Sequence, residues 1–290
     1  MNWSTAMTLG RVSNLPTVWT NVLAGVVLAG GALADARLAL LLVALSLCYV
    51  AGMFLNDAFD HRFDAQHRPE RPIPAGQVTA ATVFACGFGM LAVGIGLLAW
   101  VGHGFAGGTR WRPVAAGLAL AAAIVLYDWR HKGNPLSPVL MGLCRMLVYV
   151  TAAYAFTTVL PPRVLTASLL LLSYLVGLTY VAKQEHLGRV QNLWPLLFLA
   201  LPLAWGLHAA RTDGIVAMCA VLFGGWTLYA LHFLRRRRPG DVPRAVGCLL
   251  AGICLWDALV IAVAGQPAVA SLALGLFALT LALQRFIAPT

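Results

Sequence analysis

Apolar runs about twenty residues long recur along this 290-residue chain, and they constrain its fold more than any other feature. A helix needs roughly 20 apolar residues to cross the hydrocarbon core of a bilayer. We expect one integral membrane domain over residues 1–290, all-α, with nine to ten crossings, because one run is short enough to be a half-span. The candidate runs are residues 14–33, 37–56, 78–101, 113–128, 137–159, 164–182, 192–209, 213–234, 243–264 and 267–286.

The composition agrees with a polytopic membrane protein. Hydrophobic residues make up 60% of the chain and charged residues only 10%, and the mean hydropathy is +0.81. In soluble domains about a quarter of the residues are charged. The lower fraction in this chain indicates that most of its surface faces lipid. The net charge of +10 requires no nucleic acid, because basic loops are attracted to anionic lipid headgroups.

The basic residues predict how the chain is oriented. Lys and Arg in short loops favour the cytoplasmic side. If the N-terminus is cytoplasmic, five arginines lie on the far side, at 37, 110, 112, 163 and 211, and one, Arg145, lies inside a span. The cytoplasmic side then holds the other fourteen, at 11, 62, 68, 71, 130, 132, 183, 189, 235–238, 244 and 285.

The stretch "LNDAFDHRFDAQHRPERPIPAG", residues 55–76, concentrates acids on this cytoplasmic side. Asn56, Asp60 and Asp64 have the i, i+4, i+8 spacing of one helix face, and Asp57 lies one turn before Asp60. Hard oxygen ligands suit Mg²⁺ bridged to substrate phosphate. A solvated loop balanced by its arginines is the alternative. Ca²⁺ is disfavoured because the glycine-centred twelve-residue pattern is absent.

The same stretch resembles a known family. "NDAFDHRFD" at residues 56–64, followed by "RPERPIPAG" at 68–76, looks like the first signature of the UbiA superfamily of intramembrane prenyltransferases. The resemblance implies a bundle of about nine transmembrane helices around a central cavity with lateral access to lipid. It also implies Mg²⁺-dependent ionisation of a prenyl diphosphate, with Asn56, Asp60 and Asp64 binding the metal and Asp57 supporting them.

A second cytoplasmic segment, "YDWRHK" at residues 127–132, is similar to the family's Tyr-to-basic segment. By that resemblance Lys132 grips diphosphate and acts in catalysis with Asp60 and Asp64. Positive-inside anchoring explains Lys132 equally simply. We place Tyr127 and Asp128 among the possible cavity residues.

A third segment, "YVAKQEH" at residues 180–186, falls where the family's second acidic motif belongs, but it departs from that motif. The two expected acids are replaced by Gln184 and Gly188, and Glu185 is the acid that remains. Glu185 is then a candidate ligand of a second metal ion, with Gln184 as a neutral partner near Tyr180. The segment 180–186, together with "KGNPLSPVLMGLCR" at 132–145, resembles the EboC branch of the superfamily, which is associated with polyol-like acceptors.

Some polar residues lie inside the predicted spans, and four of them, Arg145, Asp257, Asn14 and Asn21, are candidates for a role there. Arg145 and Asp257 are costly in hydrocarbon and are expected either to pair with each other or to line the cavity. Asn14 and Asn21 either line the cavity or cap and join helices.

The predicted reaction transfers a prenyl group to a small aromatic or polyol-like acceptor at the cytoplasmic face of a cell membrane, expected to be the inner membrane of a bacterium. Charge on the departing diphosphate is neutralised by Mg²⁺ and basic side chains. Two other functions remain open: a lipid transporter, and a membrane protein that binds prenyl phosphate without catalysis. The candidate phosphate contacts are Arg68, Arg71, Lys132 and Lys183.

Overall fold

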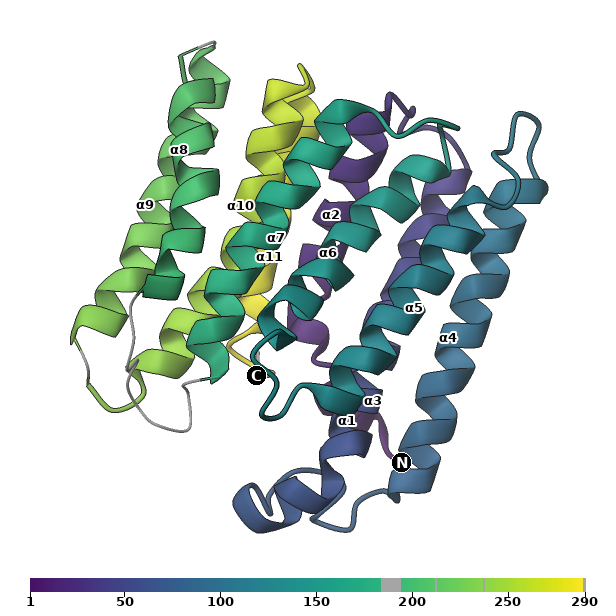
Figure 1. The fold of residues 1–290 in the computed structure, drawn as a ribbon, viewed down its shortest axis with the longest axis vertical. Coiled ribbons are helices and arrows are strands. Elements are labelled where there is room, and N and C mark those ends of the chain that lie inside the picture. Colours follow the sequence, from purple (N-terminus) through teal and green to yellow (C-terminus); the bar gives the residue numbers. More distant parts are fainter. Residues whose placement is uncertain (184–193, 212, 237, 289–290) are drawn as a thin grey trace.

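The computed structural model describes residues 1–183, 194–211, 213–236 and 238–288, and within them every regular element is a helix (Figure 1). Proline near the start of several helices fits the unpaired N–H positions there. The elements are α1 Trp3–Leu9, η1 Val12–Asn14, α2 Leu15–Ala29, α3 Arg37–His67, α4 Ala80–His103, α5 Arg112–Arg130, α6 Ser137–Tyr154, α7 Pro162–Lys183, η3 Trp194–Leu199, α8 Ala200–Ala209, α9 Gly214–Arg236, α10 Asp241–Val263 and α11 Pro267–Leu283.

The predicted all-α membrane fold is confirmed. Eight helical segments in the described part of the chain are long and apolar enough to cross a bilayer, and two shorter apolar ones, 194–209 and 267–283, bring the total to ten. The stretch expected as one span at 192–209 is not a continuous α-helix where it is described. It starts as the 3-10 helix η3 and becomes α-helical only in α8.

The helices form two packed groups that share α2 and α6 (Figure 1). Helices α3, α4 and α5 pack on one side of this pair, and α7 to α11 pack on the other. The pair itself approaches closely because Gly25 of α2 has no side chain. A Cβ at that position would lie 2.7 Å from the carbonyl oxygen of Tyr149 on α6. Small residues permit such approaches between membrane helices.

Helix α10 is the most buried helix of the group formed by α7 to α11. Every residue from Ala251 to Ala262 is buried, including Trp256 and Asp257. A helix that is hydrophobic on all sides is expected at such a position. Asp257 is therefore buried among helices and does not face lipid.

Helix α3 is longer than a membrane crossing requires. It has 31 residues, which is about 46 Å at 1.5 Å per residue, against a hydrocarbon core of about 30 Å. Its last turns carry the acidic residues and project at the same end of the bundle as the α5–α6 loop and the N-terminus (Figure 1). The candidate site is built at this end.

Candidate active site at the end of α3

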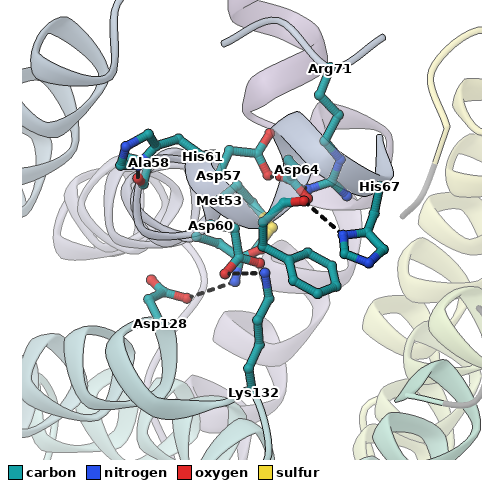
Figure 2. Close-up of polar contacts among 12 residues, drawn as sticks. Met53, Asp57, Ala58, Asp60, His61, Asp64, His67, Arg71, Asp128 and Lys132 are labelled. Carbon is teal, nitrogen blue, oxygen red and sulfur yellow. Dashed lines mark hydrogen bonds and ion pairs between the residues drawn. The ribbon is translucent and has the colours of Figure 1, made fainter. Parts of the chain in front are cut away.

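Asp60 on α3 meets the basic end of α5. The Lys132 ammonium lies 2.8 Å from Oδ1 of Asp60 (Figure 2). Nε2 of His131 lies 3.3 Å from Oδ2 of Asp60. The same ammonium lies 3.5 Å from the centroid of the Phe63 ring, a cation–π contact. Two segments far apart in the sequence, each singled out as a motif, thus place a carboxylate and a cation together.

Asp57 and Asp64 share one arginine. Nη1 of Arg71 lies 3.1 Å from Oδ1 of Asp57 and 3.0 Å from Oδ2 of Asp64, and Figure 2 shows the three side chains converging. Asp57 also accepts from Nη2 of Arg11 at 3.0 Å. Both carboxylates are buried, so each needs a cation beside it. The arginines perform that role here.

Arg11 enters the site from the N-terminal segment. Its backbone has a positive φ of 41°, and its carbonyl oxygen accepts from the Tyr49 hydroxyl at 3.2 Å. Burial by itself would lower the pKa of the guanidinium, but Asp57 raises that pKa above its ordinary value, so Arg11 keeps its charge.

Asn56 joins the acidic segment to α5 through Asp128. Its Nδ2 donates to Oδ1 of Asp128 at 3.2 Å, and its Oδ1 lies 3.5 Å from Nη2 of Arg11. Oδ2 of Asp128 is buried and has no hydrogen-bond partner among the described residues. An unpartnered buried carboxylate oxygen is costly and marks a place where a cation or water is expected.

A cavity of about 190 Å³ opens beside these polar groups. Its walls come from α2, α3, α5, α6, α7 and α10 and are mostly apolar. The predicted cavity residues Asn14, Tyr127, Asp128 and Arg145 line it. Tyr127 also stacks on His131, with ring centroids 5.1 Å apart. Such walls favour an apolar ligand.

Other predicted residues lie elsewhere or outside the described residues. Lys183 donates to the Asn134 carbonyl at 2.8 Å and to Ser137 Oγ at 2.9 Å, so it connects α7 to the start of α6.

Tyr180 packs against the core formed mainly by α7 to α11 and does not line the cavity. The Arg68 side chain forms no ion pair with the described part of the chain. Gln184 and Glu185 lie outside the described residues.

Deeper in the bundle, Arg145 and Asp257 are linked through an amide. Nη1 of Arg145 donates to Oδ1 of Asn21 at 3.0 Å, and Nδ2 of Asn21 donates to Oδ2 of Asp257 at 2.7 Å. The Tyr149 hydroxyl donates to the other oxygen of Asp257. The direct ion pair considered as one alternative is therefore absent from the described contacts, and Asn21 takes the helix-joining role.

Sequence reasoning missed three contributors to the site. Arg11 was counted only as a topology signal, His131 only as part of a basic segment, and Tyr49 only as an apolar residue. The signals for the first two were present, because a buried acid cluster needs more cations than its own segment supplies. Tyr49 lies seven residues, two helical turns, before Asn56 and so shares its face.

Comparisons with known proteins give the chain its relatives. The sequence model described as the UbiA prenyltransferase family matches residues 18–251. Digeranylgeranylglyceryl phosphate synthase of Methanopyrus kandleri is 29% identical over 217 residues, covering 74% of this chain and 72% of that protein. The protein of the same name from Methanoregula boonei is 33% identical over 98 residues, covering 33% of this chain and 32% of that protein.

Solved structures show the same fold at low identity. The apo structure of a UbiA homolog from Aeropyrum pernix K1 matches with a TM-score of 0.66 and 15% identity, covering 90% of this chain and 98% of that one. A UbiA homolog from Archaeoglobus fulgidus matches with a TM-score of 0.60 and 14% identity, covering 92% and 99%. The relatives named here are archaeal, whereas a bacterial membrane was the expectation from sequence.

Proposed function

This chain belongs to the UbiA prenyltransferase family, and from that premise we propose that it joins the prenyl group of a prenyl diphosphate to a small hydroxylated acceptor. Transfer takes place where the acidic end of α3 meets the cavity, on the cytoplasmic side of the membrane. The observation that carries the proposal is the contact of Asp60 with Lys132, which unites the two phosphate-handling motifs beside an apolar cavity.

The donor set supports a role for Mg²⁺. No three His, Cys, Asp or Glu side chains in the described part of the chain are gathered as a ready metal site. Mg²⁺ does not need one, because it keeps several waters and is commonly held by one or two carboxylates together with substrate phosphate. Asn56 and Asp128 are hydrogen-bonded to each other, and their side chains offer an amide oxygen and the unpartnered Oδ2 as hard donors. Asn56, Asp60 and Asp64 would hold the ion, with Asp57 and Asp128 adjacent.

Bound Mg²⁺ neutralises charge on the departing diphosphate oxygens. In the reaction the bond between the allylic carbon and the diphosphate oxygen breaks, and its electron pair leaves with the diphosphate. An oxygen lone pair of the acceptor forms the new bond to that carbon, and the hydroxyl proton passes to solvent or to the diphosphate. Lys132 and Arg71 place positive charge where negative charge builds, which is the form of stabilisation that lowers the barrier.

The cavity supplies what the charged residues cannot. Its mostly apolar walls hold the isoprenoid chain and keep water from the allylic cation. For the acceptor we favour a glyceryl phosphate or another polyol phosphate over an aromatic ring, because the relatives found by sequence are named digeranylgeranylglyceryl phosphate synthases. The altered motif at Gln184 and Glu185 favours a second candidate, a protein that binds prenyl diphosphate without turning it over.

One experiment tests the proposal and separates the two candidates. Purified protein in nanodiscs is incubated with Mg²⁺, radiolabelled geranylgeranyl diphosphate and glyceryl phosphate ethers, and products are identified by mass spectrometry. We expect transfer in the wild type, loss of transfer in Asp60→Asn and Asp64→Asn, and loss with EDTA that Mg²⁺ restores. Glu70→Gln is the matched control, because Glu70 is an exposed acid of the same segment.

The outcomes are distinct. Donor binding without any transfer, across donors of several lengths and aromatic as well as polyol acceptors, would favour the non-catalytic candidate. Full transfer by a well-folded Asp60→Asn variant would show that the end of α3 is not the metal site.

A further inference from the structure

Arg145 is a buried cation without a counter-ion in direct contact. Its side chain is largely buried on α6, and its one hydrogen bond within the described residues runs from Nη1 to Asn21. No carboxylate of the described residues lies within ion-pair distance of it. A guanidinium carries five N–H donors, so most of its donors are left for something else.

Asp257 does not satisfy this cation. Asn21 stands between the two residues, and both oxygens of Asp257 are already taken, one by Asn21 and one by the Tyr149 hydroxyl. The hydrogen bond to Asn21 fixes one end of the guanidinium. Arg145 also lines the cavity.

The position of Arg145 separates it from the diphosphate site. Its guanidinium lies over the Tyr49 ring, 5.3 Å from the centroid. Tyr49 precedes Asn56 by two helical turns on α3, which is about 10 Å along the axis. The cations that serve the diphosphate, Lys132 and Arg71, are at the acidic end of α3. Arg145 therefore contacts α3 about two turns before the acidic segment that begins at Asn56.

A charged side chain inside a membrane bundle is expensive and usually marks a ligand or a partner. Here no carboxylate of the described residues is within ion-pair distance of Arg145, and a cavity lies beside it. We propose that Arg145 binds an anionic group, a carboxylate or a phosphate, on the acceptor, and so selects acceptors that carry such a group about 10 Å or less from their reacting hydroxyl. This inference rests on the proposed function, because it identifies the acceptor class of the same site.

The test compares acceptors that differ only in charge. Competition against the transfer reaction is measured with two matched pairs, 4-hydroxybenzoate with 4-hydroxybenzamide and 3-phosphoglycerol ethers with their dephosphorylated forms. We expect the wild type to prefer the anionic member of at least one pair by about tenfold to a hundredfold, the range of a hydrogen bond to a charged group. Which pair shows the preference distinguishes a carboxylate from a phosphate ligand.

Variants then assign the preference to Arg145. Arg145→Gln should equalise the two members of the preferred pair, and Arg145→Lys should retain part of the preference because it keeps the charge. Asp257→Asn is the matched control, because it alters the same network without removing the cation. If Arg145 had only a structural role, Arg145→Gln and Asp257→Asn would lose similar amounts of thermal stability. The preference for the anionic acceptor would then be unchanged in both variants.

The proposal is overturned if the wild type shows no anion preference in either pair, or if Arg145→Gln keeps it. Binding of labelled geranylgeranyl diphosphate with Mg²⁺ is measured in parallel. If the wild type does not bind the labelled donor, the proposed function itself is contradicted. If it binds the donor normally but substitution of Arg145 does not change the acceptor preference, only this inference is contradicted.

Discussion

The Lys132 ammonium lies 2.8 Å from Oδ1 of Asp60, although the two residues belong to different motifs on different helices. Lys132 remains over a third exposed in its side chain, whereas Asp60 is mostly covered. A pair so open to solvent contributes little to folding, about 0–1 kcal/mol. The proposed role of the pair, contact with a substrate phosphate, is therefore testable with little effect on folding.

Lys132→Met should lower turnover by about 10²–10³-fold, the cost of removing one charge-stabilising donor from a transition state. Lys132→Arg should recover part of the rate. Steady-state kinetics with saturating acceptor checks the size of the effect, and thermal unfolding in detergent should show a shift of at most a few degrees. A large loss of stability with normal turnover in the folded fraction would assign Lys132 a structural role.

Arg71→Ala should raise the KM for prenyl diphosphate by about tenfold, because a charged hydrogen bond contributes about 1.5–3 kcal/mol. It should not raise the Mg²⁺ concentration needed for half activity, since Asp57 and Asp64 lose a competing cation. Arg62→Ala, an exposed arginine of the same segment, is the control. A higher Mg²⁺ requirement in Arg71→Ala would mean that Arg71 orders the carboxylates for the metal.

Gly25→Ala should destabilise the fold, because its Cβ would meet the Tyr149 carbonyl oxygen at 2.7 Å and Ala152 Cβ at 2.9 Å. Overpacking of this kind costs about 1–3 kcal/mol. Gly225→Ala on α9 meets nothing within 4 Å and should be neutral or stabilising by about 1 kcal/mol, since Ala is the better helix former. Thermal unfolding of both variants measures the difference, and equal midpoints would disprove the close contact between α2 and α6.

Glu185→Gln should weaken Mg²⁺-dependent binding of prenyl diphosphate, because a carboxylate ligand becomes a neutral amide. Gln184→Asp restores one acid of the family pattern and should strengthen the metal dependence or leave it unchanged. Titrating diphosphate affinity against Mg²⁺ in both variants provides the measurement. If Glu185→Gln does not change the dependence of diphosphate affinity on Mg²⁺, Glu185 binds no metal ion. The first acidic motif would then be the metal site without a contribution from Glu185.

The loops at the acidic end should all face the cytoplasm, as the excess of Lys and Arg predicts. Cysteines introduced at Gln66 and Gly133 should react with a membrane-impermeant maleimide from the same side, and one at Ala106 from the other. The six native cysteines are first replaced. Labelling of positions 66 and 133 from opposite sides would refute this topology.

The sequence was sufficient for the membrane class, the all-α fold and the placement of the first two motifs at one end of the bundle. Span lengths follow directly from bilayer thickness, and the helical spacing of Asn56, Asp60 and Asp64 needs only one helix. The irregular start of the seventh span was not predicted, because hydropathy cannot distinguish a 3-10 helix from an α-helix.

Contacts between distant segments were beyond the same reasoning. Nothing local reveals that Asn56 donates to Asp128, or that Asn21 separates Arg145 from Asp257. These contacts depend on how α2, α3, α5, α6 and α10 rotate against one another. The same holds for Lys183, whose hydrogen bonds from α7 to the Asn134 carbonyl and Ser137 Oγ could not be predicted from its motif.

The 31-residue length of α3 also determines how such an enzyme meets its substrate. In a bilayer with a hydrocarbon core of about 30 Å, a helix of about 46 Å is expected to carry its charged end into the headgroup layer, and the apolar cavity is expected to lie at the depth of the acyl chains. A prenyl diphosphate can then arrive by lateral diffusion, with its tail dissolved in the bilayer and its phosphates in water throughout. The quantity that governs the rate is therefore the mole fraction of substrate in the lipid, a two-dimensional concentration, and diluting the bilayer with inert lipid should slow the reaction even when the bulk concentration is constant.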